Sequence, residues 1–196
     1  QTCIIAALHR AMAETLRGWL GGRSVASFAA EHWERAPLHV ARNDPTAFAQ
    51  LLRLDDIDAL LCRHALIQAA GGGPTELLTF EAQRETHRFA TAHAAFASGA
   101  SLVLNHADKL WPPLNALCAS LADIFRHAYA NLYLTPHGAQ TAPPHSDDRD
   151  VFILQVAGAK VWRIWPPGTA GSATLPFADE QFGKGGEEEV RVETLG

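Results

Sequence analysis

The residues with the clearest potential for chemistry are His145 and Asp147, which stand two positions apart shortly before an apolar run at 151–156. Residues two positions apart in an extended segment project from the same face. An imidazole and a carboxylate placed in this way can bind one metal ion as neighbouring ligands. They are two of the three protein ligands in the facial triad that holds non-haem Fe(II) and leaves coordination positions open. The pair therefore predicts an open metal site.

The His-x-Asp pattern alone is a weak signal, because short motifs recur by chance. Its alternative interpretation is a polar turn at the start of a strand. A facial triad also needs a second histidine, which should come from further along the chain. No histidine follows His145 in the 196 residues of the sequence.

Three further residues accompany the pair in the predicted strand pattern. Lys160 opens a predicted strand directly after a tight connection at 157–159. Asn131 and Tyr133 share one face of an earlier predicted strand. These strands would direct a cation, an amide, a phenol and two metal ligands to a common pocket. Such a set of groups could bind a small dicarboxylate that is chelated to a metal. The alternative for Lys160 is an ordinary surface lysine at a hairpin.

Six segments of the chain carry a combined pattern that is much more specific than His-x-Asp alone. The segments are NLYLTP at 131–136, PPHSD at 143–147, DVFILQVAGAKVWR at 150–163, SFAAEHWERAPL at 27–38, LVLN at 102–105 and LWPPL at 110–114. This pattern resembles that of the JmjC-type ribosomal oxygenases, which are cupin-fold 2-oxoglutarate enzymes. The resemblance extends over residues 24–196 and weakens at 71–100.

The resemblance implies roles for the residues at matching positions. His145 and Asp147 would bind Fe(II). Lys160 would pair with the distal carboxylate of 2-oxoglutarate, where some relatives use arginine. Asn131 and Tyr133 fall at positions that line the cosubstrate pocket in the family.

The third iron ligand of the family is a distal histidine that follows a turn of the Gly-Asp-x-x-Tyr-x-Pro type. The resemblance places the start of this turn at 192–196 and the histidine a few residues beyond Gly196, so the fragment alone is expected to be inactive. We therefore expect His145 and Asp147 side by side with no third protein ligand. A triad completed by His106 or His137 would contradict this expectation.

The function implied by the resemblance is that of a dioxygenase dependent on Fe(II) and 2-oxoglutarate, which uses dioxygen to hydroxylate a protein side chain. The family suggests a histidine or an arginine of a ribosomal protein as the target, and nothing in this sequence chooses between them. A homodimer of the full-length protein is compatible with the resemblance. Two other classes stay open, because one fold hosts many functions. They are a noncatalytic cupin-fold protein that binds a metal or ligand, and an interaction module whose His-x-Asp is vestigial.

Composition indicates a soluble globular chain, 47% hydrophobic, with a formal net charge of −5. The negative charge argues against direct nucleic-acid binding, which needs a basic face. No apolar run approaches the ~18 residues of a membrane span, and the first residues lack the order of a signal peptide. Cys3, Cys62 and Cys118 are odd in number and far apart, which favours reduced thiols over metal ligands. A reducing compartment is expected, the cytoplasm or, in a eukaryote, the nucleus or nucleolus.

The expected fold class is mixed α+β, with helices first and strands later. A helical N-terminal flank with the first strand or strands would occupy 1–100. The first part of a double-stranded β-helix, the jelly-roll barrel of cupins, would occupy 101–196, with its C-terminal part missing. Periodicity and capping residues predict helices at 4–20, from Asp44, from Asp55 and at 114–125. Alternation and turn residues predict strands at 76–80, 129–134, 151–156, 160–165 and 189–194.

Several other conspicuous residues are expected to be structural. Trp162 and Trp165 are expected to pack the barrel, with substrate contact as the alternative. His106 and His137 are loop residues nearer the predicted site and are the better candidates for touching substrate. The other histidines lie in helical or loop contexts without ligand spacing; they are His9, His32, His39, His64, His87, His93 and His127.

Overall fold

The computed structural model describes residues 14–143, 145–147, 149–164, 180–181 and 188–193. The chain packs as two compact units, which are described separately. The first, called the sheet unit, is Phe48–Pro144. The second, called the terminal unit, combines Gln1–Ala47 with His145–Gly196. The division predicted at residue 100, between a helical flank and a partial barrel, stays a prediction.

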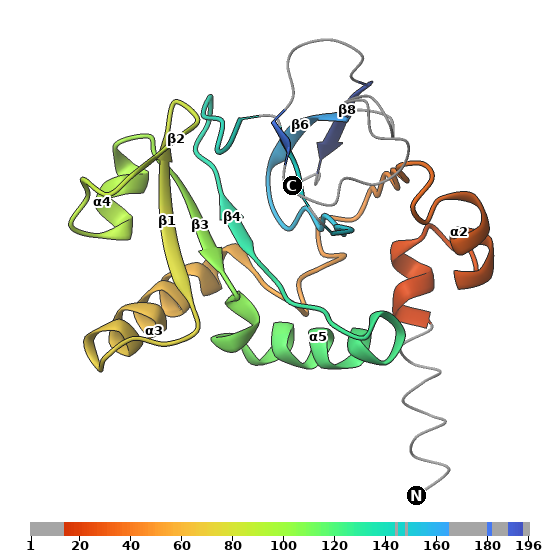
Figure 1. The fold of residues 1–196 in the computed structure, drawn as a ribbon, viewed down its shortest axis with the longest axis horizontal. Helices are drawn as coiled ribbons and strands as arrows, with labels where there is room; N and C mark the ends of the chain where they lie inside the picture. The colour runs from red at the N-terminus through yellow and green to blue at the C-terminus, as the bar shows by residue number, and fades with distance from the viewer. Residues whose placement is uncertain (1–13, 144, 148, 165–179, 182–187, 194–196) are drawn as a thin grey trace, which may run out of the picture. The chain divides into compact units, whose positions relative to one another are not determined.

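A four-stranded antiparallel sheet organises the sheet unit (Figure 1). Its strand order is β2-β1-β3-β4, so that β3 has a partner on each side. The first four residues of β3 are buried, and this explains the uninterrupted apolar run LVL, since a strand covered on both faces needs no polar alternation. The strands are β1 (Glu76–Glu81), β2 (Arg84–Thr86), β3 (Ser101–Asn105) and β4 (Leu132–Leu134).

Two helices of the sheet unit begin at residues that favour a helix start. Thr91 caps the second α-helix of this unit, since its hydroxyl accepts a 3.1 Å hydrogen bond from the backbone N–H of Ala94. The last helix begins with proline, whose missing N–H costs nothing in a first helical turn. The elements are the 3-10 helix η1 (Leu54–Asp56), α3 (Ile57–Ala69), α4 (Ala92–Ala97), the 3-10 helix η2 (Ala107–Lys109) and α5 (Pro112–Phe125).

The terminal unit contains an aromatic cluster and two pairs of strands. Phe152 lies 6.2 Å from Trp19 and 6.1 Å from Phe28 between ring centroids, and Phe28 lies 6.0 Å from Trp33. Strand β5 pairs with β7 and β6 pairs with β8, both antiparallel. The elements are helical residues 14–19, α2 (Val25–Glu31), β5 (His145–Ser146), β6 (Ala159–Ile164), β7 (Glu180–Gln181) and β8 (Glu188–Glu193).

Most predicted elements are present, and the mixed α+β class is confirmed. The strands predicted at 76–80, 160–165 and 189–194 correspond to β1, β6 and β8. The helices predicted from Asp55 and at 114–125 correspond to η1 with α3 and to α5. The helix predicted at 4–20 is observed over 14–19, and its first part lies outside the described residues. No helix in the described ranges is both long and apolar enough to cross a membrane.

Three predicted elements differ from the structure. The strand predicted at 129–134 is shortened to β4, because the backbone N–H and carbonyl of Ala130 bond to η2. Asp44 was predicted to cap a helix; it accepts a 2.8 Å bond from the backbone N–H of Thr46, but residues 45–51 form successive turns and no helix. Residues 151–156 have no strand assignment, although Phe152 and Leu154 are half-buried while Val151 and Ile153 are exposed.

Candidate metal and cosubstrate site

The predicted ligand pair lies at β5 of the terminal unit. His145 Nε2 and Asp147 Oδ1 are 3.4 Å apart, and each side chain is 40% exposed. Two donors that bind one first-row metal ion at ~2.0–2.2 Å and at roughly right angles to each other are separated by ~3 Å. The observed separation is close to that value, so the donor set and its spacing fit two neighbouring ligands of one ion.

A second histidine–aspartate pair gives a comparison within the same chain. His93 Nε2 in α4 lies 2.9 Å from Asp58 Oδ1 in α3, and both side chains are largely exposed. This pair joins two helices of the sheet unit across 35 positions of sequence, and its spacing does not resemble a ligand motif. In the described ranges, no group of three histidine, cysteine, aspartate or glutamate side chains could hold a metal ion. The pair at β5 is therefore distinguished by its sequence context and not by the interaction alone.

Lys160 lies on the more buried face of β6. Exposure alternates along this strand, with Lys160, Trp162 and Ile164 half-buried and Val161 and Arg163 exposed. Burial lowers the pKa of the Lys160 ammonium below its ordinary value, because a charged group loses hydration there. Its Nζ lies 6.0 Å from the centre of the Trp162 ring, at the limit of a cation–π contact. Lys160 is therefore not a fully solvated hairpin lysine.

Asn131 and Tyr133 belong to the sheet unit. Asn131 lies immediately before β4 and Tyr133 within it; both are exposed, while Leu132 and Leu134 are half-buried. The side-chain Oδ1 of Asn131 accepts a 3.0 Å hydrogen bond from the backbone N–H of His106. His106 has a left-handed backbone, φ 54°, which is uncommon outside glycine. Asn131 thus stabilises the turn after β3, a role that its position in the sequence did not indicate.

A buried carboxylate supports the same turn. Asp108 is 2% exposed, and its Oδ1 accepts a 3.0 Å bond from the backbone N–H of Ala130, the residue before Asn131. Its Oδ2 lies 3.2 Å from Lys109 Nζ. Sequence reasoning missed Asp108. The available signal was an acidic residue between an apolar strand and a Trp-Pro-Pro helix start, where a loop carboxylate commonly accepts backbone N–H groups.

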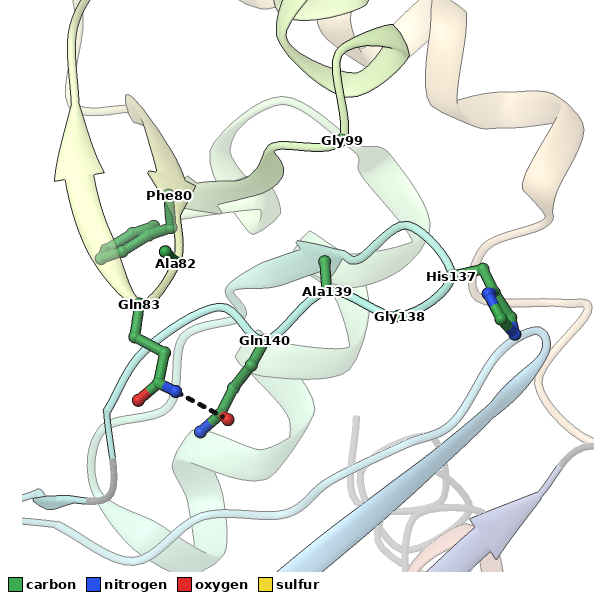
Figure 2. A pocket seen from close by; sticks show the side chains of 8 residues that line it. All are labelled: Phe80, Ala82, Gln83, Gly99, His137, Gly138, Ala139 and Gln140. Carbon is green, nitrogen blue, oxygen red and sulfur yellow. Dashed lines mark hydrogen bonds between the residues drawn. The ribbon is translucent and has the colours of Figure 1, made fainter.

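The sheet unit also contains an open pocket of about 440 Å³. Figure 2 shows the side-chain amides of Gln83 and Gln140 turned towards each other, and Gln83 Nε2 donates a 3.0 Å hydrogen bond to Gln140 Oε1. Amides and exposed backbone suit hydrogen bonding to peptide groups better than metal binding. His137, predicted to be near substrate, lies in this lining. The lining residues are Phe80, Ala82, Gln83, Gly99, His137, Gly138, Ala139 and Gln140.

Comparison with known proteins identifies similar sequences over most of the chain. The JmjC domain family matches residues 89–188, a range that includes all five predicted site residues. Ribosomal oxygenase 1 of Gallus gallus is 34% identical over 87% of this chain and 29% of its own length. The bifunctional lysine-specific demethylase and histidyl-hydroxylase NO66 of Culex quinquefasciatus is 31% identical over 90% of this chain and 28% of its own length. The chain thus spans less than a third of the length of these relatives.

Proposed function

Because the chain belongs to the JmjC-type ribosomal oxygenase family, we propose that it carries the cosubstrate-binding part of a protein hydroxylase. JmjC oxygenases have a cupin fold and generally use Fe(II) and 2-oxoglutarate. When bound, the iron and 2-oxoglutarate supply the oxidising chemistry, in which dioxygen is reduced, 2-oxoglutarate loses carbon dioxide to give succinate, and the substrate gains a hydroxyl group. The chain's own residues provide binding and orientation.

The single observation that carries the proposal is the 3.4 Å separation of His145 Nε2 and Asp147 Oδ1 in the segment that matches the family. The pair would supply two ligands to the iron, and a third protein ligand would complete the triad. Because both side chains are only part-exposed, the site keeps access for substrate while limiting the water around it.

Lys160 would bind the far carboxylate of 2-oxoglutarate. An ammonium that has lost hydration gains from an anionic partner more than a fully solvated one does, because the local dielectric is lower. Its place on the half-buried face of β6 supports this role. Fixing the far end of the cosubstrate orients the keto acid for chelation, which is a positioning effect.

For the substrate, we propose a histidine or arginine side chain of a ribosomal protein. Support comes from the relatives' names, which specify a ribosomal oxygenase and a histidyl-hydroxylase. Asn131, immediately before β4, and Tyr133, in β4, are both exposed and fall at positions that line the cosubstrate pocket in the family. The free thiols of Cys62 and Cys118 support a reducing compartment, the cytoplasm or, in a eukaryote, the nucleus or nucleolus.

The test is alanine replacement of His145 or Asp147 in the full-length protein. We expect succinate production to fall by more than the ~10–100-fold typical of residues that merely support metal ligands. We also expect the rise in Tm caused by Mn(II) to disappear, because that rise reflects binding to the folded state. His93→Ala is the matched control, since it removes the histidine of an exposed His–Asp pair, and both readouts should stay unchanged.

Activity within twofold of wild type in either ligand variant would contradict the assignment. The alternative, a noncatalytic cupin, predicts a Tm rise with Mn(II) in the wild type and no succinate. A vestigial motif in an interaction module predicts neither. The two readouts therefore separate the three classes.

A further inference from the structure

The indole N–H of Trp162 is a buried donor without a partner. Its Nε1 atom has almost no solvent exposure, and no hydrogen-bond partner lies in the described part of the chain. A buried polar group in this state carries its full desolvation penalty, and native structures leave few such groups unexplained. An indole nitrogen can only donate, so its missing partner must be an acceptor.

The position of Trp162 indicates which acceptor that is. It lies two residues after Lys160 on the same half-buried face of β6, and the Lys160 Nζ is 6.0 Å from the centre of its ring. A charged donor and a neutral donor are thus placed next to each other on one strand. A carboxylate has two oxygens and about four acceptor sites, so one carboxylate can satisfy both donors.

We propose that Trp162 is a second binding residue for the cosubstrate, donating its indole N–H to the far carboxylate of 2-oxoglutarate that Lys160 neutralises. The inference rests on the proposed function, because it presupposes that 2-oxoglutarate binds beside Lys160. A rigid indole adds direction to the flexible lysine, since its N–H cannot follow a carboxylate that sits one carbon nearer or further. The tryptophan therefore contributes to selection by chain length, and the packing role expected for it is only part of its function.

The experiment compares Trp162→Phe with wild type in the full-length protein loaded with Mn(II), and measures 2-oxoglutarate affinity by calorimetry. Phenylalanine keeps an aromatic ring and removes the donor. We expect affinity to fall about tenfold, as is typical for loss of a hydrogen bond to a charged group. Trp111→Phe is the control, because the Trp111 N–H already donates to the Leu51 carbonyl at 2.9 Å; its affinity should stay within twofold.

Nuclear magnetic resonance tests the same proposal on the wild-type protein, without any substitution. In wild-type protein labelled with ¹⁵N-tryptophan, the Trp162 indole resonance should move downfield when 2-oxoglutarate is added. It should also move downfield when glutarate is added after the metal has been removed with a chelator. It should not move downfield with 2-oxopentanoate, which lacks the far carboxylate.

An unmoved resonance on saturation with 2-oxoglutarate overturns the proposal, as does unchanged affinity in a folded Trp162→Phe. If wild type binds no 2-oxoglutarate, the proposed function fails together with the inference, and that outcome is distinct from a variant with unchanged affinity.

Discussion

The sheet unit and the terminal unit use β-structure in different ways. In the sheet unit, β3 lies between two antiparallel partners, and its leucines are almost completely buried. In the terminal unit, β5 and β6 each pair with one other described strand. His145 and Lys160 lie on these strands and Asp147 immediately follows β5; all three side chains are partly exposed.

Under the proposed function, the rigid core and the metal-binding residues belong to different segments. A buried central strand tolerates little change, because protein interiors are packed at crystal-like density. Residues that bind a metal or a carboxylate need access, which a fully packed strand does not give. We therefore expect substitutions in the buried strand β3 to act on stability, and substitutions of His145, Asp147 and Lys160 to act on binding.

The largest stability effect expected from a single core truncation is that of Leu104→Ala. This leucine of β3 is 1% exposed, and truncation of a buried leucine costs ~2–5 kcal/mol of unfolding free energy. Ile153→Ala, at an exposed position of the terminal unit, should cost less than ~1 kcal/mol. Urea unfolding followed by circular dichroism measures both. Equal losses would remove the proposed contrast between the units.

Lys160→Ala should act on the cosubstrate with little effect on the fold. We expect the 2-oxoglutarate requirement to rise by ~10- to 1000-fold, because a hydrogen bond to a charged group is worth ~1.5–3 kcal/mol or more in a desolvated site. Arg163→Ala removes a cation from the exposed face of the same strand and serves as the control. Steady-state titration of 2-oxoglutarate measures the effect. Equal behaviour of the two variants would mean that another residue binds the carboxylate.

The smallest predicted effect is a pH dependence of stability from His64 in α3. Burial lowers the pKa of this histidine, and a hydrogen bond with the Thr75 backbone opposes that change only in part. Below its ordinary pKa of ~6.5 the unfolded chain binds a proton that the folded state resists. Stability should be constant above that pH and decline as the pH falls from ~6.5 towards the lowered folded value. Urea midpoints at pH 7.5 and 5.5 test this, and the decline should shrink in His64→Gln.

Sequence periodicity predicted much of this architecture, because strand alternation is a local property. It predicted the strand that begins near Lys160, which is observed as β6, and it grouped Asn131 with Tyr133, which are both exposed. It could not predict the bond between Gln83 and Gln140, which are 57 positions apart. Nor could alternation alone show that the strand predicted at 151–156 would have no partner in the described ranges, because pairing depends on distant segments.

The bond between Asn131 and His106 also determines what Asn131 can recognise. A backbone N–H can only donate, so the oxygen of the Asn131 amide must face it. The amide orientation is thereby set by the protein, and the group available to a ligand is the NH₂. In the proposed binding role, Asn131 would therefore act as a directional donor to a carbonyl, a carboxylate or an unprotonated imidazole nitrogen, with its amide orientation set by the turn after β3.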